Sequence, residues 1–139
     1  MPTFPKYMVK RLVPENAVTL VGDELHVKIV NVLATIPFEK VPDHFIKLST
    51  IKVDGEVVIS PDKPELVDKV KLVVRGKAYP ITGIKDIEGG DLPPGETMEL
   101  VVPNVKKFAK GETHSLEATL YDRPKKADPL VIAFERKIY

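Results

Sequence analysis

The chain lacks several residue types, and each absence narrows what it can do. None of its 139 residues is cysteine, which excludes disulfides, thiolate nucleophiles and zinc–thiolate sites. Small secreted domains often depend on disulfides, so we expect a cytoplasmic protein. Tryptophan is also absent, and aromatic residues make up only 6% of the chain. The composition therefore does not indicate a platform of aromatic rings for stacking on sugars.

Long apolar runs and an excess of charge are missing as well. No run approaches the roughly 20 apolar residues that span a bilayer, and the first residues lack the apolar core of a signal peptide. The 21 basic and 20 acidic residues give a formal net charge of +1. Nucleic-acid-binding proteins and polybasic membrane-surface proteins carry a large basic face. We therefore expect neither nucleic acid nor a membrane as a partner.

Lysine, glutamate and proline are the residues that the chain has in quantity. Its 13 prolines lie mainly between the expected strands. This composition, without cysteine, is typical of thermophile proteins. Ordinary variation in composition would give the same numbers, so both interpretations stay open.

Short runs of alternating apolar and polar residues, separated by glycine and proline turns, dominate the sequence. Clear examples are residues 25–29, 69–75, 97–102 and 115–120. Only a half-buried strand has a side-chain period of two, and no long segment has a helical period. The pattern predicts an all-β fold: one domain over residues 1–139, an antiparallel β-sandwich of about eight or nine strands, jelly-roll or immunoglobulin-like.

Turn residues and prolines give more local predictions. Asp54-Gly55 is the clearest hairpin turn, between strands at 46–53 and 57–59. Pro64 suits the first turn of a short helix that includes residues 66–68. Glycines in residues 82–91 predict a flexible connection there. Residues 130–134 are mostly apolar, and this predicts a central strand.

Candidate functional residues gather in one segment, residues 36–45, which contains two prolines and two phenylalanines without a clear period. Such a loop either folds over the end of the sandwich or meets a partner or ligand, since loops carry much of protein function. The site residues that it predicts are Phe38, Asp43, His44 and Phe45. The other two histidines, His26 and His114, are interpreted as surface residues.

Motifs for catalysis are not found. The sequence contains no GxSxG, Walker A, GxGxxG or HExxH motif, and no two histidines have metal-ligand spacing. We therefore predict no catalytic residue, no metal ligand and no cofactor in this chain, which we expect to be inactive on its own.

Several segments in order resemble the small β-subunit of the C-glycoside deglycosidases and its uncharacterised relatives. The opening Lys6-Tyr7-Met8-Val9 and a strand pair around Gly22-Asp23 come first. The hairpin Val53-Asp54-Gly55-Glu56-Val57, the step Arg75-Gly76-Lys77-Ala78-Tyr79 and the turn Gly89-Gly90-Asp91-Leu92-Pro93-Pro94-Gly95-Glu96 follow. The segment Ile36-Pro37-Phe38-Glu39-Lys40-Val41-Pro42 departs from that family's pattern. The resemblance spans most of the chain.

The resemblance implies an all-β accessory subunit of a hetero-oligomeric sugar-acting enzyme. Its partner would be a sugar-phosphate-isomerase-like (β/α) barrel subunit that holds a divalent metal and the catalytic residues, and the loop at 36–45 would contact it. Two alternatives stay open, because fold does not fix function. One is a structural or interaction module that associates with itself as a homo-oligomer, and the other is a small-molecule or carbohydrate-binding module.

Overall fold

The computed structural model describes residues 6–32, 35–38, 50–60, 62–87, 90–120 and 130–139. Its strands are β1 Val18–Val21, β2 Glu24–Val30, β3 Ile36–Pro37, β4 Thr50–Val53, β5 Glu56–Ile59, β6 Lys71–Val74, β7 Lys77–Pro80, β8 Asp91–Leu92, β9 Thr97–Pro103, β10 Thr113–Leu120 and β11 Leu130–Lys137. Its helices are α1 Lys6–Leu12, α3 Pro64–Val67 and the 3₁₀ helix η2 Ile81–Asp86. In the described residues no helix is long and apolar enough to cross a membrane.

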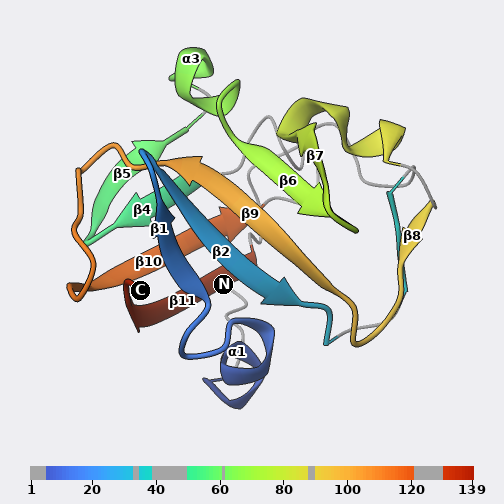
Figure 1. Cartoon of the computed structure of the whole chain (residues 1–139), viewed down its shortest axis with the longest axis horizontal. Helices are drawn as coiled ribbons and strands as arrows, with labels where there is room; N and C mark the ends of the chain where they lie inside the picture. The colour runs from blue at the N-terminus through green and yellow to red at the C-terminus, as the bar shows by residue number, and fades with distance from the viewer. Residues whose placement is uncertain (1–5, 33–34, 39–49, 61, 88–89, 121–129) are drawn as a thin grey trace.

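The strands form two antiparallel sheets, which confirms the all-β sandwich. One sheet has five strands in the order β1-β2-β9-β6-β7, and the other has four in the order β11-β10-β4-β5. Figure 1 shows the five-stranded sheet in front of the four-stranded sheet, with α1 below and α3 above. A ribbon of β3 and β8 stands apart from both sheets. The two main sheets together match the predicted number of strands.

The main core lies between the two sheets. Leu25 and Val27 of β2 face Val53 of β4, and all three side chains are at most 5% exposed. Inward residues alternate with outward ones because successive side chains of a strand point to opposite faces. This is the pattern from which the strands were predicted.

A second core lies under the part of the five-stranded sheet that includes β6 and β7. Leu72, Val74 and Tyr79 of the sheet pack here against Ile84, Ile87, Leu92 and Phe38. The prediction of a flexible connection at 82–91 is therefore wrong for its first part. Residues 81–86 form η2, which is kinked at Gly83, and the buried Ile84 and Ile87 pack this segment against the sheet.

Two hairpins have the turns that their sequences require. Asp54-Gly55 and Arg75-Gly76 each have positive φ angles, 51° and 83° in the first pair and 53° and 79° in the second. Two positive φ angles in succession are the geometry of the tight hairpin turn that matches strand twist. The short helix α3 also follows the prediction, with Pro64 in its first turn.

The position of β11 differs from the prediction. It lies at the edge of its sheet, next to β10 alone, so the prediction of a central strand at 130–134 is wrong. The apolar residues of β11 are explained by Ile132 and Phe134, which pack on the main core. Beyond β11, the backbone of Tyr139 exchanges two hydrogen bonds of 2.9 Å with Val18 and Leu20 of β1. The chain thus joins the edges of the two sheets along one seam.

Helix α1 is not predicted from the sequence, because seven residues are too few to show a helical period. Val9 and Leu12 are its buried residues, and the buried Val13 follows it. The guanidinium of Arg136 in β11 donates hydrogen bonds to the Val13 and Pro14 carbonyl oxygens, at 2.7 to 3.2 Å. Val13 follows the last residue of α1, where a helix alone leaves carbonyls without partners, whereas the Pro14 carbonyl also accepts a hydrogen bond from the Ala17 N–H.

Candidate functional site

Of the four predicted loop residues, the structure describes only Phe38. Phe38 is 3% exposed and packs in the second core, and its backbone N–H donates to the Gly90 carbonyl at 2.9 Å. Asp43, His44 and Phe45 lie outside the described residues. Phe38 is therefore a core residue. The partner-facing role of the other three stays a prediction.

The structure does bring together a different set of side chains, at the end of the sandwich where β4 turns into β5. His114, at the start of β10, has its Nδ1 2.7 Å from Asp54 Oδ2 and its Nε2 3.4 Å from Glu112 Oε1. Its ring stacks on Phe108 with centroids 3.5 Å apart and planes 12° apart. A side chain predicted to lie free on the surface is thus held on three sides, and 17% of it is exposed.

The connection between β9 and β10, residues 104–112, is organised by its own side chains. Asn104 accepts a hydrogen bond from the Phe108 N–H at 2.9 Å and donates one to the Phe108 carbonyl at 3.0 Å. The Ala109 N–H donates to Glu112 Oε1 at 2.6 Å, and Lys106 forms an ion pair with Glu56 on β5. Compact loops held by internal bonds often carry function.

Electrostatics in this cluster favour ionised carboxylates. The Ser115 N–H donates to Asp54 at 3.0 Å, and this hydrogen bond, with that to His114, lowers the pKa of the Asp54 carboxyl. The Ala109 N–H, followed by His114, lowers the pKa of Glu112 in the same way. Hydrogen bonds to the charged form stabilise that form. The two carboxylates fasten loop 104–112 to the β4–β5 turn.

We expect this cluster to make the free energy of unfolding pH-dependent. A carboxyl whose pKa is lower in the folded state stabilises the fold above its unfolded pKa, and this contribution is lost as pH falls through the folded pKa. The loss should begin as pH falls through the ordinary pKa of each carboxyl, 4.5 for Glu112 and 3.8 for Asp54. Asp54→Asn keeps an acceptor for Ser115 and tolerates the positive φ angle. Its urea-unfolding profile should therefore be flatter than that of the wild type in this acid range.

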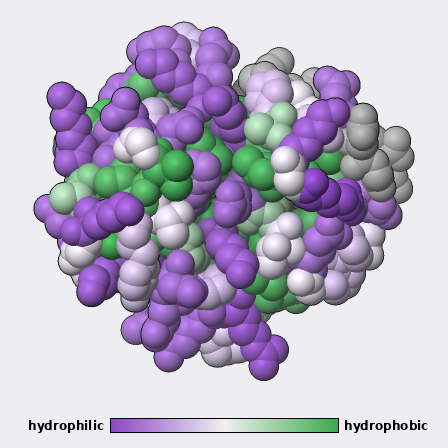
Figure 2. Space-filling view, viewed as in Figure 1, coloured by the Kyte–Doolittle hydropathy of each residue, from purple (hydrophilic) through white to green (hydrophobic). Residues whose placement is uncertain are grey.

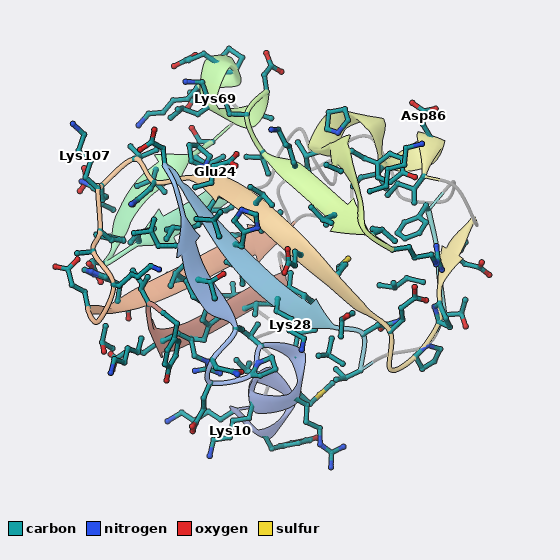
Figure 3. All side chains as sticks on the ribbon, viewed as in Figure 1. Lys10, Glu24, Lys28, Lys69, Asp86 and Lys107 are labelled. Atoms are coloured by element: carbon teal, nitrogen blue, oxygen red, sulfur yellow. The ribbon has the colours of Figure 1, made fainter. Side chains whose placement is uncertain are left out.

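The matched control for this measurement is Asp86→Asn, which removes an exposed carboxylate far from the cluster (Figure 3). The Asp86 carboxylate has no hydrogen bond or ion pair within the described part of the chain, so its variant should keep the wild-type slope. Equal slopes for wild type and Asp54→Asn in this acid range would contradict the role of Asp54.

An open groove lies beside the organised loop. Its apolar lining includes Leu20, Leu66 and Val105, and two lysines, Lys69 and Lys107, also line it. The cavity inside this end of the sandwich is small, at about 20 Å³, room for about one water molecule. Among the described residues, the larger hollow is therefore the surface groove.

The outer face of the five-stranded sheet carries a second polar cluster, around His26 of β2. His26 Nδ1 lies 3.3 Å from Glu99 Oε2, and its Nε2 lies 4.0 Å from Glu24 Oε1. Lys71 approaches the same Glu24 at 3.9 Å. His26 faces outward as predicted, but its side chain is only 20% exposed. Its Nε2 is buried without a hydrogen-bond partner in the described structure.

Neither cluster has the donor set of a metal site. The described residues contain no group of three or more histidine, cysteine, aspartate or glutamate side chains placed to hold a metal ion. The His114 cluster has a histidine between carboxylates but no nucleophile within its hydrogen bonds, since Ser115 contributes its backbone N–H. Its contacts hold the β4–β5 turn, loop 104–112 and the start of β10 together.

Sequence reasoning missed the His114 cluster because its members are far apart in the chain. Asp54 and His114 are separated by 60 residues, and they meet because β4 pairs with β10. Asp54 was assigned to its turn, which is correct, but that turn also aims the carboxylate at β10. The sequence pattern that could have indicated the cluster is the pair Glu112 and His114, two residues apart at the start of a strand.

Comparison with known proteins adds no relative: no family model matches the chain, and no curated protein matches it.

Proposed function

We propose that this chain is a non-catalytic accessory subunit of a hetero-oligomeric enzyme that acts on sugars, of the C-glycoside deglycosidase kind. In this proposal a (β/α) barrel partner holds the divalent metal and the catalytic groups. The β-sandwich contacts the barrel and completes the assembly. The proposal rests on the family resemblance together with one feature of the surface.

That feature is exposed apolar surface beside an organised loop. Val21 is 54% exposed and Val105 is 43% exposed. Both lie within two residues of the 2.9 Å hydrogen bond between the Asn104 N–H and the Asp23 carbonyl, so the β1–β2 turn and loop 104–112 are adjacent. Figure 2 shows apolar patches among charged side chains on this face of the molecule. Exposed apolar patches rimmed by polar residues are typical of contact sites between proteins.

The segments that carry the resemblance have definite structural roles, which also supports the proposal. Asp54-Gly55 forms the β4–β5 turn. Tyr79 after the Arg75-Gly76 turn is buried, and Arg75 contacts Glu96 of the Pro-Gly-Glu turn at 2.9 Å. The same sequence pattern in a relative would build the same turns. The fold observed is the one that the resemblance implies.

The test is to purify the tagged full-length chain from its native cells and to measure what accompanies it. We expect a barrel protein in equal amounts, and we expect the pair to hydrolyse or cleave glycosides with added Mn²⁺ or Mg²⁺ when neither protein does so alone. His44→Ala and Phe45→Ala should then weaken the complex, while exposed Tyr7→Ala should leave it unchanged. Phe38→Ala is unsuitable here because Phe38 is a core residue.

Two outcomes would contradict the proposal. Recovery of the chain alone as a symmetric homo-oligomer would favour the self-associating module. Recovery as a monomer that binds a sugar would favour the binding module.

A further inference from the structure

The groove beside loop 104–112 has a charge pattern that distinguishes it from the rest of this end of the molecule. Two other lysines at this end form ion pairs: Lys106 with Glu56, and Lys71 with Glu24. Lys69 and Lys107 line the groove, and the side-chain ammonium of neither has an ion pair or hydrogen bond within the described part of the chain. Figure 3 shows both at the same end of the molecule, away from Lys10 and Asp86.

Lys107 is also held in an unfavourable backbone conformation. Among the described residues, three that are not glycine have positive φ angles, and two of them, Asp54 and Arg75, start tight turns that continue with glycine. Lys107 has a φ of 53° without a glycine after it. A side chain in this region is strained relative to glycine, and such residues cluster at functional sites. The lysine side chain is thus kept where glycine would fit better.

The remaining lining of the groove is apolar with one carboxylate. Leu20, Leu66 and Val105 contribute apolar surface, and Asp23 is the acidic member among the described lining residues. The lysines outnumber it, so the groove has a net positive charge. A ligand that fits must bring carboxylates to the lysines and apolar groups to the floor between them.

We propose that this groove binds an acidic segment of the partner protein in which carboxylate side chains flank apolar ones. This inference rests on the accessory-subunit function proposed above and names a second surface that meets the partner, besides the loop at 36–45. Electrostatic attraction of this kind chiefly raises the association rate and is screened by salt, whereas the apolar floor slows dissociation.

The test measures binding of the co-purified partner to the full-length chain at low and at high salt. Lys69→Gln/Lys107→Gln should weaken binding roughly tenfold at low salt, mainly through the association rate, and the loss should shrink at high salt. Lys10→Gln/Lys28→Gln removes the same charge from lysines without ion pairs elsewhere on the described surface (Figure 3), and it should leave binding unchanged.

A single variant separates binding from folding. Lys107→Gly relieves the positive φ angle, so the free chain should be at least as stable as the wild type in urea while binding the partner more weakly. A photo-crosslinking residue in place of Val105 should attach to a partner segment that contains aspartate or glutamate next to apolar residues.

The outcomes separate the two proposals. The groove inference is wrong, and the accessory function stands, if Lys69→Gln/Lys107→Gln binds the partner as well as Lys10→Gln/Lys28→Gln does. The same holds if the crosslink falls in a segment without carboxylates or in a second copy of this chain. If no partner accompanies the chain at all, both proposals fail.

Discussion

Replacing Phe38 with alanine should destabilise the fold by about 3–5 kcal/mol. The side chain is 3% exposed and packs with Leu72, Tyr79 and Leu92 in the second core. Its removal leaves a cavity under β6 and β7, where the β3–β8 ribbon is held to the sheet. The loss of buried apolar surface and the unfilled cavity both add to the cost.

Urea unfolding of the full-length chain measures this effect as a lower midpoint with an unchanged slope. Tyr7→Ala is the matched control, because Tyr7 is an aromatic residue that is 68% exposed and its variant should shift stability by no more than about 0.5 kcal/mol. Phe38→Leu should lose less stability than Phe38→Ala because leucine fills more of the space that the ring occupies. A Phe38→Ala variant as stable as Tyr7→Ala would show that the ring is not a core side chain.

The result also bears on how loop 36–45 is interpreted. Its aromatic residues predicted either packing over the sandwich or contact with a partner, and the sequence offered no way to choose for each residue. Phe38 lies next to β3, which pairs with β8, and this pairing with a distant segment places the ring in the core. A nonlocal contact of this kind leaves no trace in local sequence pattern.

Features governed by local chemistry were predicted well. The Asp54-Gly55 turn follows from the need for positive φ angles. The alternation of Val70, Leu72 and Val74 predicted one buried face, and all three are at most 5% exposed. Each of these predictions depends on neighbours within a few residues.

Features governed by strand order were predicted poorly. An apolar run such as residues 130–134 is compatible with a central strand or with an edge strand whose inward side chains meet a core. Only the pairing of β11 with β10 alone decides between them. The His114 cluster is not predicted for the same reason: it forms only because β10 lies beside β4.

Strand order also places the end of β11 beside β1, at the seam between the sheets. There we expect Ile138→Ala to lower the free energy of unfolding by about 2–5 kcal/mol. Ile138 is 1% exposed in the main core. Its N–H donates to the Glu112 carbonyl at 2.8 Å, and its carbonyl accepts from Gly111 at 2.8 Å. Its side chain fixes the backbone that reaches β1.

Tyr139→Ala is the matched control at the adjacent residue. The Tyr139 side chain is 47% exposed, while its backbone makes the two bonds to Val18 and Leu20 that an alanine would keep. Its variant should therefore lose at most about 1 kcal/mol, including the contact of its ring with Lys137. Ile138→Val should lie between, at about 0.5–1.5 kcal/mol.

Hydrogen exchange then tests whether Ile138 supports the seam as well as the core. The Leu20 N–H donates to the Tyr139 carbonyl at 2.9 Å, so in Ile138→Ala its protection should fall more than global destabilisation explains. Leu25 N–H, inside the five-stranded sheet, reports the global change. If Leu20 and Leu25 lose protection equally, Ile138 acts through the core alone. If Ile138→Ala costs no more than Tyr139→Ala, the side chain does not hold the two sheets together, and the unpaired edge of β1 must be stabilised in another way.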